Sequence, residues 1–151
     1  MLAKKTIFAG LAALSISYSA FAANNLANIV KKVAPSVVNL TVEKNISEED
    51  AAKLHRRGIN PSLLNPYVTG SGVIINSKHG VIVTNDHVVH DSKTIVVQLK
   101  DGSRHLGKVI GEAKQFDLAV LLIQADNLHA IAPSDSDQLK VGDHVAAIGS
   151  P

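Results

Sequence analysis

Short runs of valine, isoleucine and leucine, separated by tight polar turns, constrain the fold of this chain more than any other feature. Runs of about four to eight residues that are β-branched or alternate between apolar and polar side chains are typical of strands. The Asp101-Gly102 pair between two of the runs is typical of a hairpin turn. The runs lie at 36–43, 70–75, 81–83, 93–99, 104–111, 117–123 and 145–148. Six or seven short strands with tight turns predict an all-β fold built on an antiparallel barrel.

Residues 1–22 have the composition of a secretory signal peptide and are excluded from the predicted fold. Two lysines give the positive start, Thr6 to Leu14 gives the apolar centre, and Ala20-Phe21-Ala22 gives a cleavage site of the small-x-small kind. The apolar centre is shorter than the roughly 18 residues that a spanning helix needs, so a retained anchor is the weaker interpretation. We therefore expect an exported, periplasmic protein whose mature chain begins near Ala23.

Charge and composition exclude several classes of function. The chain has 15 basic and 13 acidic residues, and removal of Lys4 and Lys5 with the signal peptide leaves 13 of each. A neutral chain without a basic stripe and with 3% aromatic residues lacks the electrostatic surface of a nucleic-acid-binding protein. No later segment approaches the roughly 18 apolar residues of a membrane span. Because the sequence has no cysteine, its fold must be stabilised by apolar burial rather than by disulfides.

Two segments outside the strands have recognisable patterns. The apolar residues between Asn25 and Ala34 have helical spacing, and Pro35 would end that helix. Residues 44–68 carry a mixed charge run followed by a glycine and prolines, which indicates a long surface loop. Within this loop, Ser47 with Asp50 three residues later is typical of the start of a small capped helix. Long loops of this kind are either functional or poorly ordered, and both interpretations stay open here.

One histidine lies where a general base would be usefully placed. His87 follows the run 81–83 after a polar triplet, so it would lie at a rigid strand end, at the surface or in a cleft. Asp117 begins another apolar run thirty residues later, and its carboxylate would accept the Nδ1 proton of His87 so that Nε2 faces a substrate. The plainer alternatives are a loop histidine without a role and an aspartate that merely begins a strand.

A metal site is a competing interpretation of the same histidine. His87 and His90 have the i, i+3 spacing of metal ligands, and Asp91 follows directly. The two residues between the histidines are β-branched, however, and the sequence offers no evident third and fourth ligand. We therefore expect no metal and no other cofactor.

Several ordered segments of the chain resemble the HtrA/Deg family of periplasmic, trypsin-like serine proteases. The match around His87 is Gly70-Ser71-Gly72-Val73-Ile74-Ile75, followed by Val83-Thr84-Asn85-Asp86-His87-Val88-Val89. The further matches, in the family's order, are 33–38, 96–102, 116–120, 139–143 and 147–151. The resemblance covers residues 25–151 apart from the loop 44–68, which makes it more specific than any single motif.

The resemblance implies an architecture and a chemistry. It implies a chymotrypsin-like N-terminal barrel over residues 23–143 and the first strand of a second barrel over residues 144–151. It implies that His87 is the general base, that Asp117 orients it, and that the loop 44–68 stands in place of the family's long regulatory loop. The implied function is the hydrolysis of unfolded or misfolded polypeptides in periplasmic quality control, by trimers or higher homo-oligomers.

The family's nucleophile has no counterpart in these 151 residues, which contain no Gly-Asn-Ser-Gly-Gly segment, no oxyanion hole formed by it and no PDZ module. Ser71 precedes a central strand and Ser134, Ser136 and Ser150 lie in turns, so none is a good substitute. Loss of the triad serine in subtilisin costs on the order of 10⁶ in kcat, roughly 8 kcal/mol. We therefore expect the chain to be inactive alone, with residues 144–151 loosely held. The alternative is a non-enzymatic exported remnant that binds peptides or acts as a chaperone.

Overall fold

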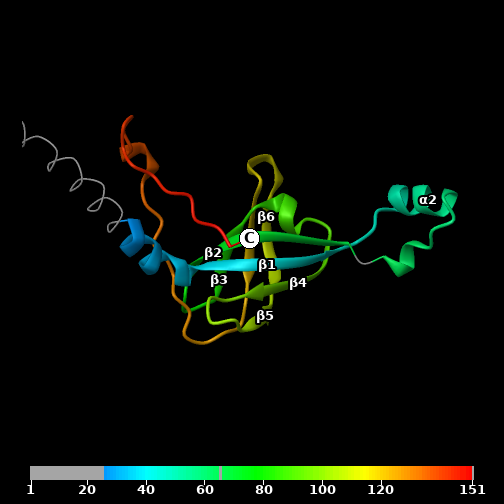
Figure 1. The fold of residues 1–151 in the computed structure, drawn as a ribbon, viewed down its shortest axis with the longest axis horizontal. Coiled ribbons are helices and arrows are strands. Elements are labelled where there is room, and N and C mark those ends of the chain that lie inside the picture. Colours follow the sequence, from blue (N-terminus) through cyan, green and yellow to red (C-terminus); the bar gives the residue numbers. More distant parts are fainter. Residues whose placement is uncertain (1–25, 65, 151) are drawn as a thin grey trace, which may run out of the picture. The chain divides into compact units, whose positions relative to one another are not determined.

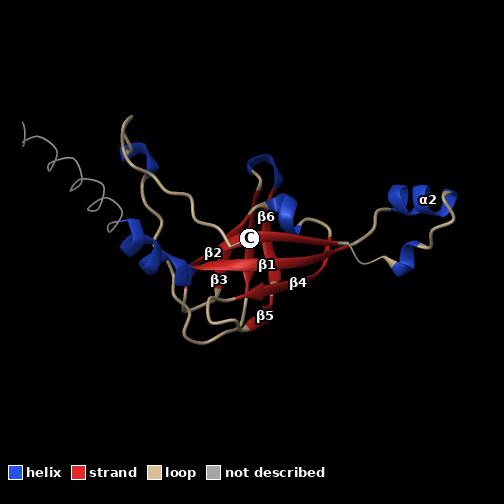
Figure 2. Cartoon of the chain, in the orientation of Figure 1, coloured by secondary structure: helices blue, strands red, loops and turns tan. Residues whose placement is uncertain are grey.

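The computed structural model describes residues 26–64 and 66–150, and the predicted signal peptide lies outside them. The described residues fall into two units with a boundary between Lys32 and Val33, and each unit is described by itself. Residues 26–33 are helical, as their apolar spacing predicts (Figure 2). A 3-10 turn, Ala34–Ser36, follows the helix and has Pro35 near its start. Proline lacks the N–H that a continuing helix would need, which explains why the helix ends there.

The second unit is built on one antiparallel sheet (Figure 1). Its strands are β1 (Val37–Lys44), β2 (Tyr67–Asn76), β3 (Val81–Thr84), β4 (Ser92–Gln98), β5 (Arg104–Leu106), β6 (Lys108–Ala113) and β7 (Leu118–Leu122). The strand order is β5-β4-β1-β2-β3-β7-β6, and every neighbouring pair is antiparallel. The all-β, antiparallel architecture predicted from the short apolar runs is confirmed.

A single residue, Gly107, links the two edge strands of the sheet. The sequence predicts one strand over 104–111, but the structure divides that stretch into β5, which pairs with β4, and β6, which pairs with β7. These two strands lie at opposite ends of the strand order and are joined by Gly107 alone, so the chain links both edges of the sheet. The Gly107 N–H donates to the carbonyl of Ile95 at 2.9 Å. A Cβ at this position would lie 3.0 Å from Cγ2 of Ile95, so the close approach favours glycine.

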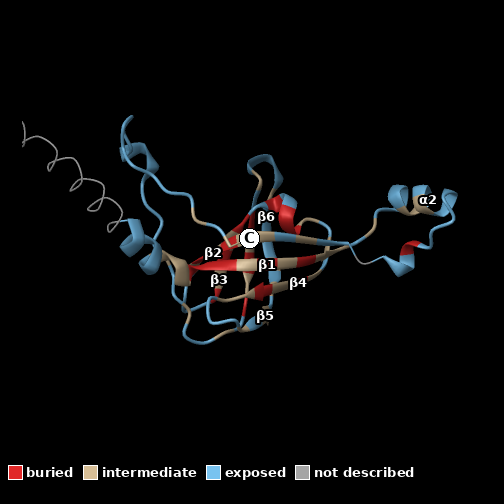
Figure 3. Ribbon diagram, in the orientation of Figure 1, coloured by how far each residue is buried: buried red, intermediate tan, exposed pale blue. Residues whose placement is uncertain are grey.

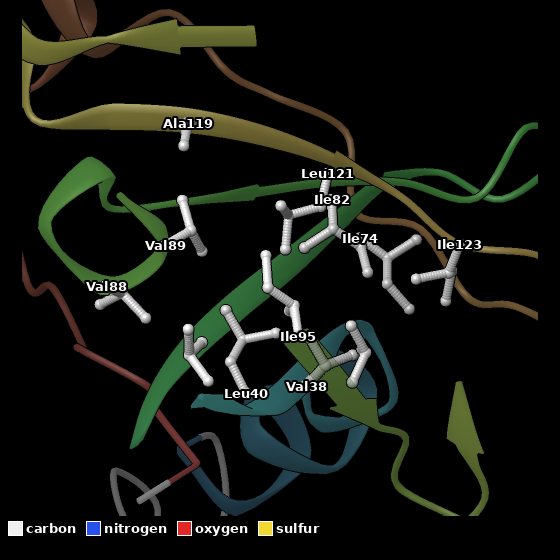
Figure 4. Packing of buried hydrophobic residues seen from close by; sticks show 12 residues of the cluster. Val38, Leu40, Ile74, Ile82, Val88, Val89, Ile95, Ala119, Leu121 and Ile123 are labelled. Carbon is white, nitrogen blue, oxygen red and sulfur yellow. The ribbon is translucent and has the colours of Figure 1, made fainter. Parts of the chain in front are cut away.

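The buried core of the described residues is made of aliphatic side chains. Residues of β1 alternate, so Val38, Leu40 and Val42 are buried on one face. They pack against apolar side chains of β2, β3, β4 and β7, and against Val88 and Val89 of the short helix α3 (Asp86–Val89) (Figure 4). Figure 3 shows the buried parts of β1 and β4 in red. The remaining members of the cluster are Ile74, Ile82, Ile95, Val97, Ala119, Leu121 and Ile123. Burial of these side chains is the main source of stability, as expected for a chain without cysteine.

The segment between β1 and β2 contains the predicted capped helix. Helix α2 (Glu48–Arg56) begins after Ser47, whose hydroxyl accepts a hydrogen bond from the Asp50 N–H at 3.1 Å. None of its residues is buried, and a 3-10 turn, Pro61–Leu63, follows. The flanking strands reach Lys44 and resume at Tyr67, so the segment is slightly shorter than the predicted loop 44–68.

The strand predicted at residues 145–148 is not observed. Residues 143–150 form neither helix nor strand, and Val145 is 78% exposed. A strand is stabilised by hydrogen bonds to a neighbour, and none of the strands in residues 26–64 and 66–150 pairs with this segment. Its end is nevertheless held, because the Ser150 N–H donates to Oγ of Ser71 at 2.9 Å and the Ser150 carbonyl accepts from Nδ2 of Asn39 at 2.9 Å. Among the described residues, no helix is both long and apolar enough to cross a membrane.

Candidate active site

Helix α3 presents His87 at the end of β3. The helix is a single turn whose Val88 and Val89 are buried in the core (Figure 4). The side chain of His87, in contrast, is exposed. Thr84, the last residue of β3, is buried and donates its hydroxyl hydrogen to the carbonyl of Ser71 on β2 at 2.8 Å. The strand end that precedes His87 is therefore fixed from two sides, by apolar packing and by a hydrogen bond. A scaffold of this kind holds a catalytic side chain in one place.

Asp117 occupies a left-handed backbone position rather than the first position of a strand. It follows a 3-10 turn, Lys114–Phe116, has φ 51° and ψ 45°, and precedes β7, which begins at Leu118. The sequence predicts a strand that starts at Asp117 itself, and this boundary is wrong by one residue. Aspartate is among the few residues that adopt the left-handed region readily, because its short polar side chain can bond locally. The reversal at this residue turns its carboxylate toward α3.

The structure brings the side chains of His87 and Asp117 into direct contact. Nδ1 of His87 lies 2.8 Å from Oδ2 and 2.9 Å from Oδ1 of Asp117. The backbone N–H of His87 also donates to Oδ1 at 3.0 Å. These donors hold the pKa of the Asp117 carboxyl below its ordinary value, with the backbone N–H of His87 as the largest cause and its imidazole next. The carboxyl group is therefore ionised at neutral pH.

An ionised Asp117 decides which nitrogen of His87 carries the proton. A carboxylate only accepts hydrogen bonds, so Nδ1 must be the protonated nitrogen of the neutral ring. The lone pair of Nε2 then points away from Asp117, and the His87 side chain is 69% exposed. The arrangement can accept a proton at Nε2 and stabilise the resulting imidazolium through Asp117, which is the work of a general base.

Two further residues support the pair, and sequence reasoning assigned neither of them a role. Asn85 donates its side-chain amide to Oδ2 and to the backbone carbonyl of Asp117, each at 3.1 Å. Asn85 is the N-cap residue of α3, but its side chain makes no capping bond, and its amide nitrogen donates to Asp117 instead. Lys44, at the end of β1, donates from Nζ to the carbonyls of His87, at 3.1 Å, and His90. Asn85 lies in the polar triplet directly before His87, so its position could have indicated a role at the site. Lys44 is distant from His87 in the sequence, and no nearby pattern indicates its role.

No serine hydroxyl of the described residues forms a hydrogen bond with His87. Ser71 is engaged elsewhere, since its Oγ accepts from the Ser150 N–H at 2.9 Å and donates to the Ser150 carbonyl at 3.3 Å. The competing metal hypothesis paired His87 with His90. Among the described residues, His87 belongs to no group of three possible metal ligands. The one group of three possible ligands among them is Asp86, His90 and Glu112.

Comparison with known proteins identifies the family. Residues 70–151, more than half of the chain, match the family described as the trypsin-like peptidase domain. The chain is 41% identical over 142 residues to the "Probable periplasmic serine endoprotease DegP-like" of Buchnera aphidicola subsp. Baizongia pistaciae. It is 39% identical over 134 residues to the "Periplasmic pH-dependent serine endoprotease DegQ" of Escherichia coli. Each alignment covers 84% of this chain and 30% of the relative. The chain belongs to the HtrA/DegP family of trypsin-like peptidases.

Solved structures of two proteases share the fold described above. The "HtrA-type protease AlgW with tripeptide" has a TM-score of 0.61 and 32% identity, and the match covers 78% of this chain and 32% of that one. The serine endoprotease from Yersinia pestis has a TM-score of 0.58 and 31% identity over the same share of this chain and 36% of its own. The likeness confirms a chymotrypsin-like N-terminal β domain. This HtrA/DegP-family chain spans about a third of the length of the relatives it matches.

Proposed function

We propose that this chain supplies the general base and its orienting carboxylate to a periplasmic serine endopeptidase. The observation that carries the proposal is the contact of Nδ1 of His87 with both carboxylate oxygens of Asp117, at 2.8 and 2.9 Å. Membership of the trypsin-like peptidases supports it, because His and Asp on one barrel are two of the three residues of their triad. We further propose that residues 23–143 form this N-terminal barrel and that residues 144–151 lead into a second one.

The chemistry follows from the protonation state of the pair. Nε2 of His87 takes the proton of a serine hydroxyl as that oxygen attacks the scissile carbonyl, and the acyl-enzyme forms when the protonated ring passes the proton to the leaving amine. Asp117 stabilises the imidazolium in between and keeps the ring in one orientation. The serine itself and the oxyanion donors belong to a Gly-Asn-Ser-Gly-Gly segment that the 151 residues do not contain. The chain alone is therefore proposed to be inactive toward peptide bonds.

Extended polypeptides in the periplasm are the proposed substrates. Curated relatives are named periplasmic serine endoproteases, and HtrA-type relatives have been solved with a tripeptide. The pattern of residues 1–22 supports export, since it has a positive start, an apolar centre and a small-x-small end. We further propose, by likeness to the family, that the protein acts in quality control as a homo-oligomer of three or more chains.

A chimera tests this proposal directly. Residues 23–151 are joined to the part of the E. coli DegQ chain that follows its aligned region, which restores a serine-bearing second half. We expect this chimera to degrade casein and to be inactivated by a serine-directed phosphonate, whereas the 151-residue chain does neither. His87→Ala should abolish turnover, and His79→Ala, a change of another exposed histidine, should leave it intact.

Two results would contradict the proposal. Casein cleavage by the 151-residue chain alone would show that its nucleophile lies within the printed sequence. A folded chimera that stays inactive, while the chain still binds a labelled unfolded protein, would favour the non-enzymatic, chaperone-like alternative.

A further inference from the structure

We propose that Asp86, His90 and Glu112 form a binding site for a divalent transition-metal cation of the zinc class. The site is separate from the His87–Asp117 pair and does not depend on the proposed peptidase function. One ligand atom from each of the three residues lies within 4.8 Å of the other two. Asp86 and His90 come from α3 and its C-cap, and Glu112 comes from β6, so the site joins the helix to a strand of the sheet.

The buried carboxylate of Asp86 is the observation that points to a ligand. Asp86 is only 7% exposed, and its Oδ1 has no hydrogen-bond partner among the described residues. An ionised carboxylate that is buried without a partner is costly, because it loses its hydration and gains nothing in return. A cation held between Asp86, His90 and Glu112 would give the buried Asp86 carboxylate a partner. Exposed acidic clusters often have no ligand, but a buried and unsatisfied member distinguishes this one from them.

The spacing and chemistry of the donors fit a zinc-like ion. Nδ1 of His90 lies 3.4 Å from Oε1 of Glu112. Two ligands that are each about 2.0–2.1 Å from a tetrahedral zinc ion lie roughly 3.3–3.5 Å apart, so this pair already has the required separation. One imidazole and two carboxylates are a mixed nitrogen and oxygen set, which suits zinc and its first-row neighbours better than calcium or magnesium. Three protein ligands leave a fourth position for water.

The second nitrogen of His90 has the partner that a metal-bound imidazole usually has. Nε2 of His90 lies 3.2 Å from Oδ2 of Asp91, so an Nε2–H would donate to that carboxylate and leave the Nδ1 lone pair directed toward Glu112. Asp91 has φ 55°, a left-handed conformation that places its carboxylate beside the ring.

Two lysine side chains lie near the site, and their positive charges would oppose the binding of a metal cation. Lys44 is engaged with the backbone carbonyls of His87 and His90. Nζ of Lys114 lies 3.1 Å from Nε2 of His90, and this exposed side chain would turn to solvent when Nε2 carries a proton. The carboxylates of Asp86, Asp91 and Glu112 outnumber the two ammonium groups, so the local charge still favours a cation.

Calorimetric titration of the full chain with ZnCl2 tests this site. We expect one zinc ion per chain, with affinity at least about tenfold weaker in Asp86→Asn and in Glu112→Gln. Both variants keep the shape of the side chain and remove its charge. Asp91→Asn, which tolerates the left-handed conformation, should weaken binding by about 10-fold through the second nitrogen of His90. His79→Gln is the matched control and should bind as the parent chain does.

A cobalt titration supplies a readout of the ligands themselves. Visible d–d absorption should appear in the parent chain and in the His79→Gln control, and it should be lost in Glu112→Gln. The absence of zinc binding at millimolar metal would overturn the proposal. Binding that survives Glu112→Gln, or that disappears in His87→Gln while Glu112→Gln is unaffected, would also overturn it.

Discussion

Gly70 sets the position of the helix that carries His87, and its replacement should push that helix outward. A Cβ added at Gly70 would lie 2.7 Å from Cγ1 and 2.9 Å from Cγ2 of Val88. Ordinary carbon contacts are about 3.5–4.0 Å, so Val88 would have to move by about 1 Å. Val88 is 5% exposed and β-branched, so it has no easy alternative rotamer. The clash must therefore be relieved by displacement of α3.

The energies of the two single changes can be estimated separately. Gly70→Ala should lower the free energy of unfolding by about 1–2 kcal/mol, since overpacking costs about 1–3 kcal/mol and the loss of glycine's freedom in the unfolded chain returns part of it. Val88→Ala should cost about 2 kcal/mol, from two buried methyl groups and the space they leave. In the double variant the new methyl group occupies that space, so its total loss should be about 2 kcal/mol or less.

Urea denaturation of the four proteins measures this coupling. The predicted coupling between the two changes is at least about 1 kcal/mol, with m-values unchanged. Gly111→Ala is the matched control, because nothing lies within 4 Å of a Cβ built there, and it should add to Val88→Ala without coupling. The reasoning would be refuted if the loss of unfolding free energy in the double variant equalled the sum of the losses for Gly70→Ala and Val88→Ala to within about 0.5 kcal/mol.

Two further predictions concern Asp117 and Ser47. The folded-state pKa of Asp117 is lowered, so its contribution to stability is present above about pH 4, the unfolded value, and is lost as the pH falls through the folded pKa. Its carboxyl ¹³C shift should therefore titrate below pH 3.8, and a midpoint at or above that value would contradict the hydrogen bonds described. Ser47→Ala should destabilise α2 by about 1 kcal/mol, seen as faster amide exchange over 50–56, and unchanged exchange would show that the cap contributes nothing.

Local pattern was sufficient to predict most of the strands, because period-two burial is encoded within a few residues. Local pattern could not reveal the division of residues 104–111 at Gly107. The two halves pair with different strands, at opposite ends of the strand order. The same limit explains the strand expected at 145–148. Its apolar residues have the right pattern, but a strand exists only where a neighbour accepts its hydrogen bonds.

The apolar runs beside His87 and Asp117 made their pairing one possible interpretation of the sequence, and the resemblance to the HtrA/Deg proteases assigned them their roles. The contacts that support the pair could not be predicted from the sequence. Asn85 has the profile of a helix cap, and only the left-handed turn at Asp117 brings the carboxylate to its amide. Glu112 approaches His90 through the register of β6 against β7, which no spacing in the sequence encodes.

The most direct test of the central claim is the effect of Asp117→Asn on casein hydrolysis by the DegQ chimera. This change keeps the size of the side chain and removes the charge that fixes the Nδ1–H tautomer of His87. In trypsin the corresponding loss is about 10⁴ in kcat, so we expect a decrease of that order at neutral pH, with little change in KM. A decrease smaller than about tenfold would show that Asp117 does not orient the base, and the account of this site would be wrong.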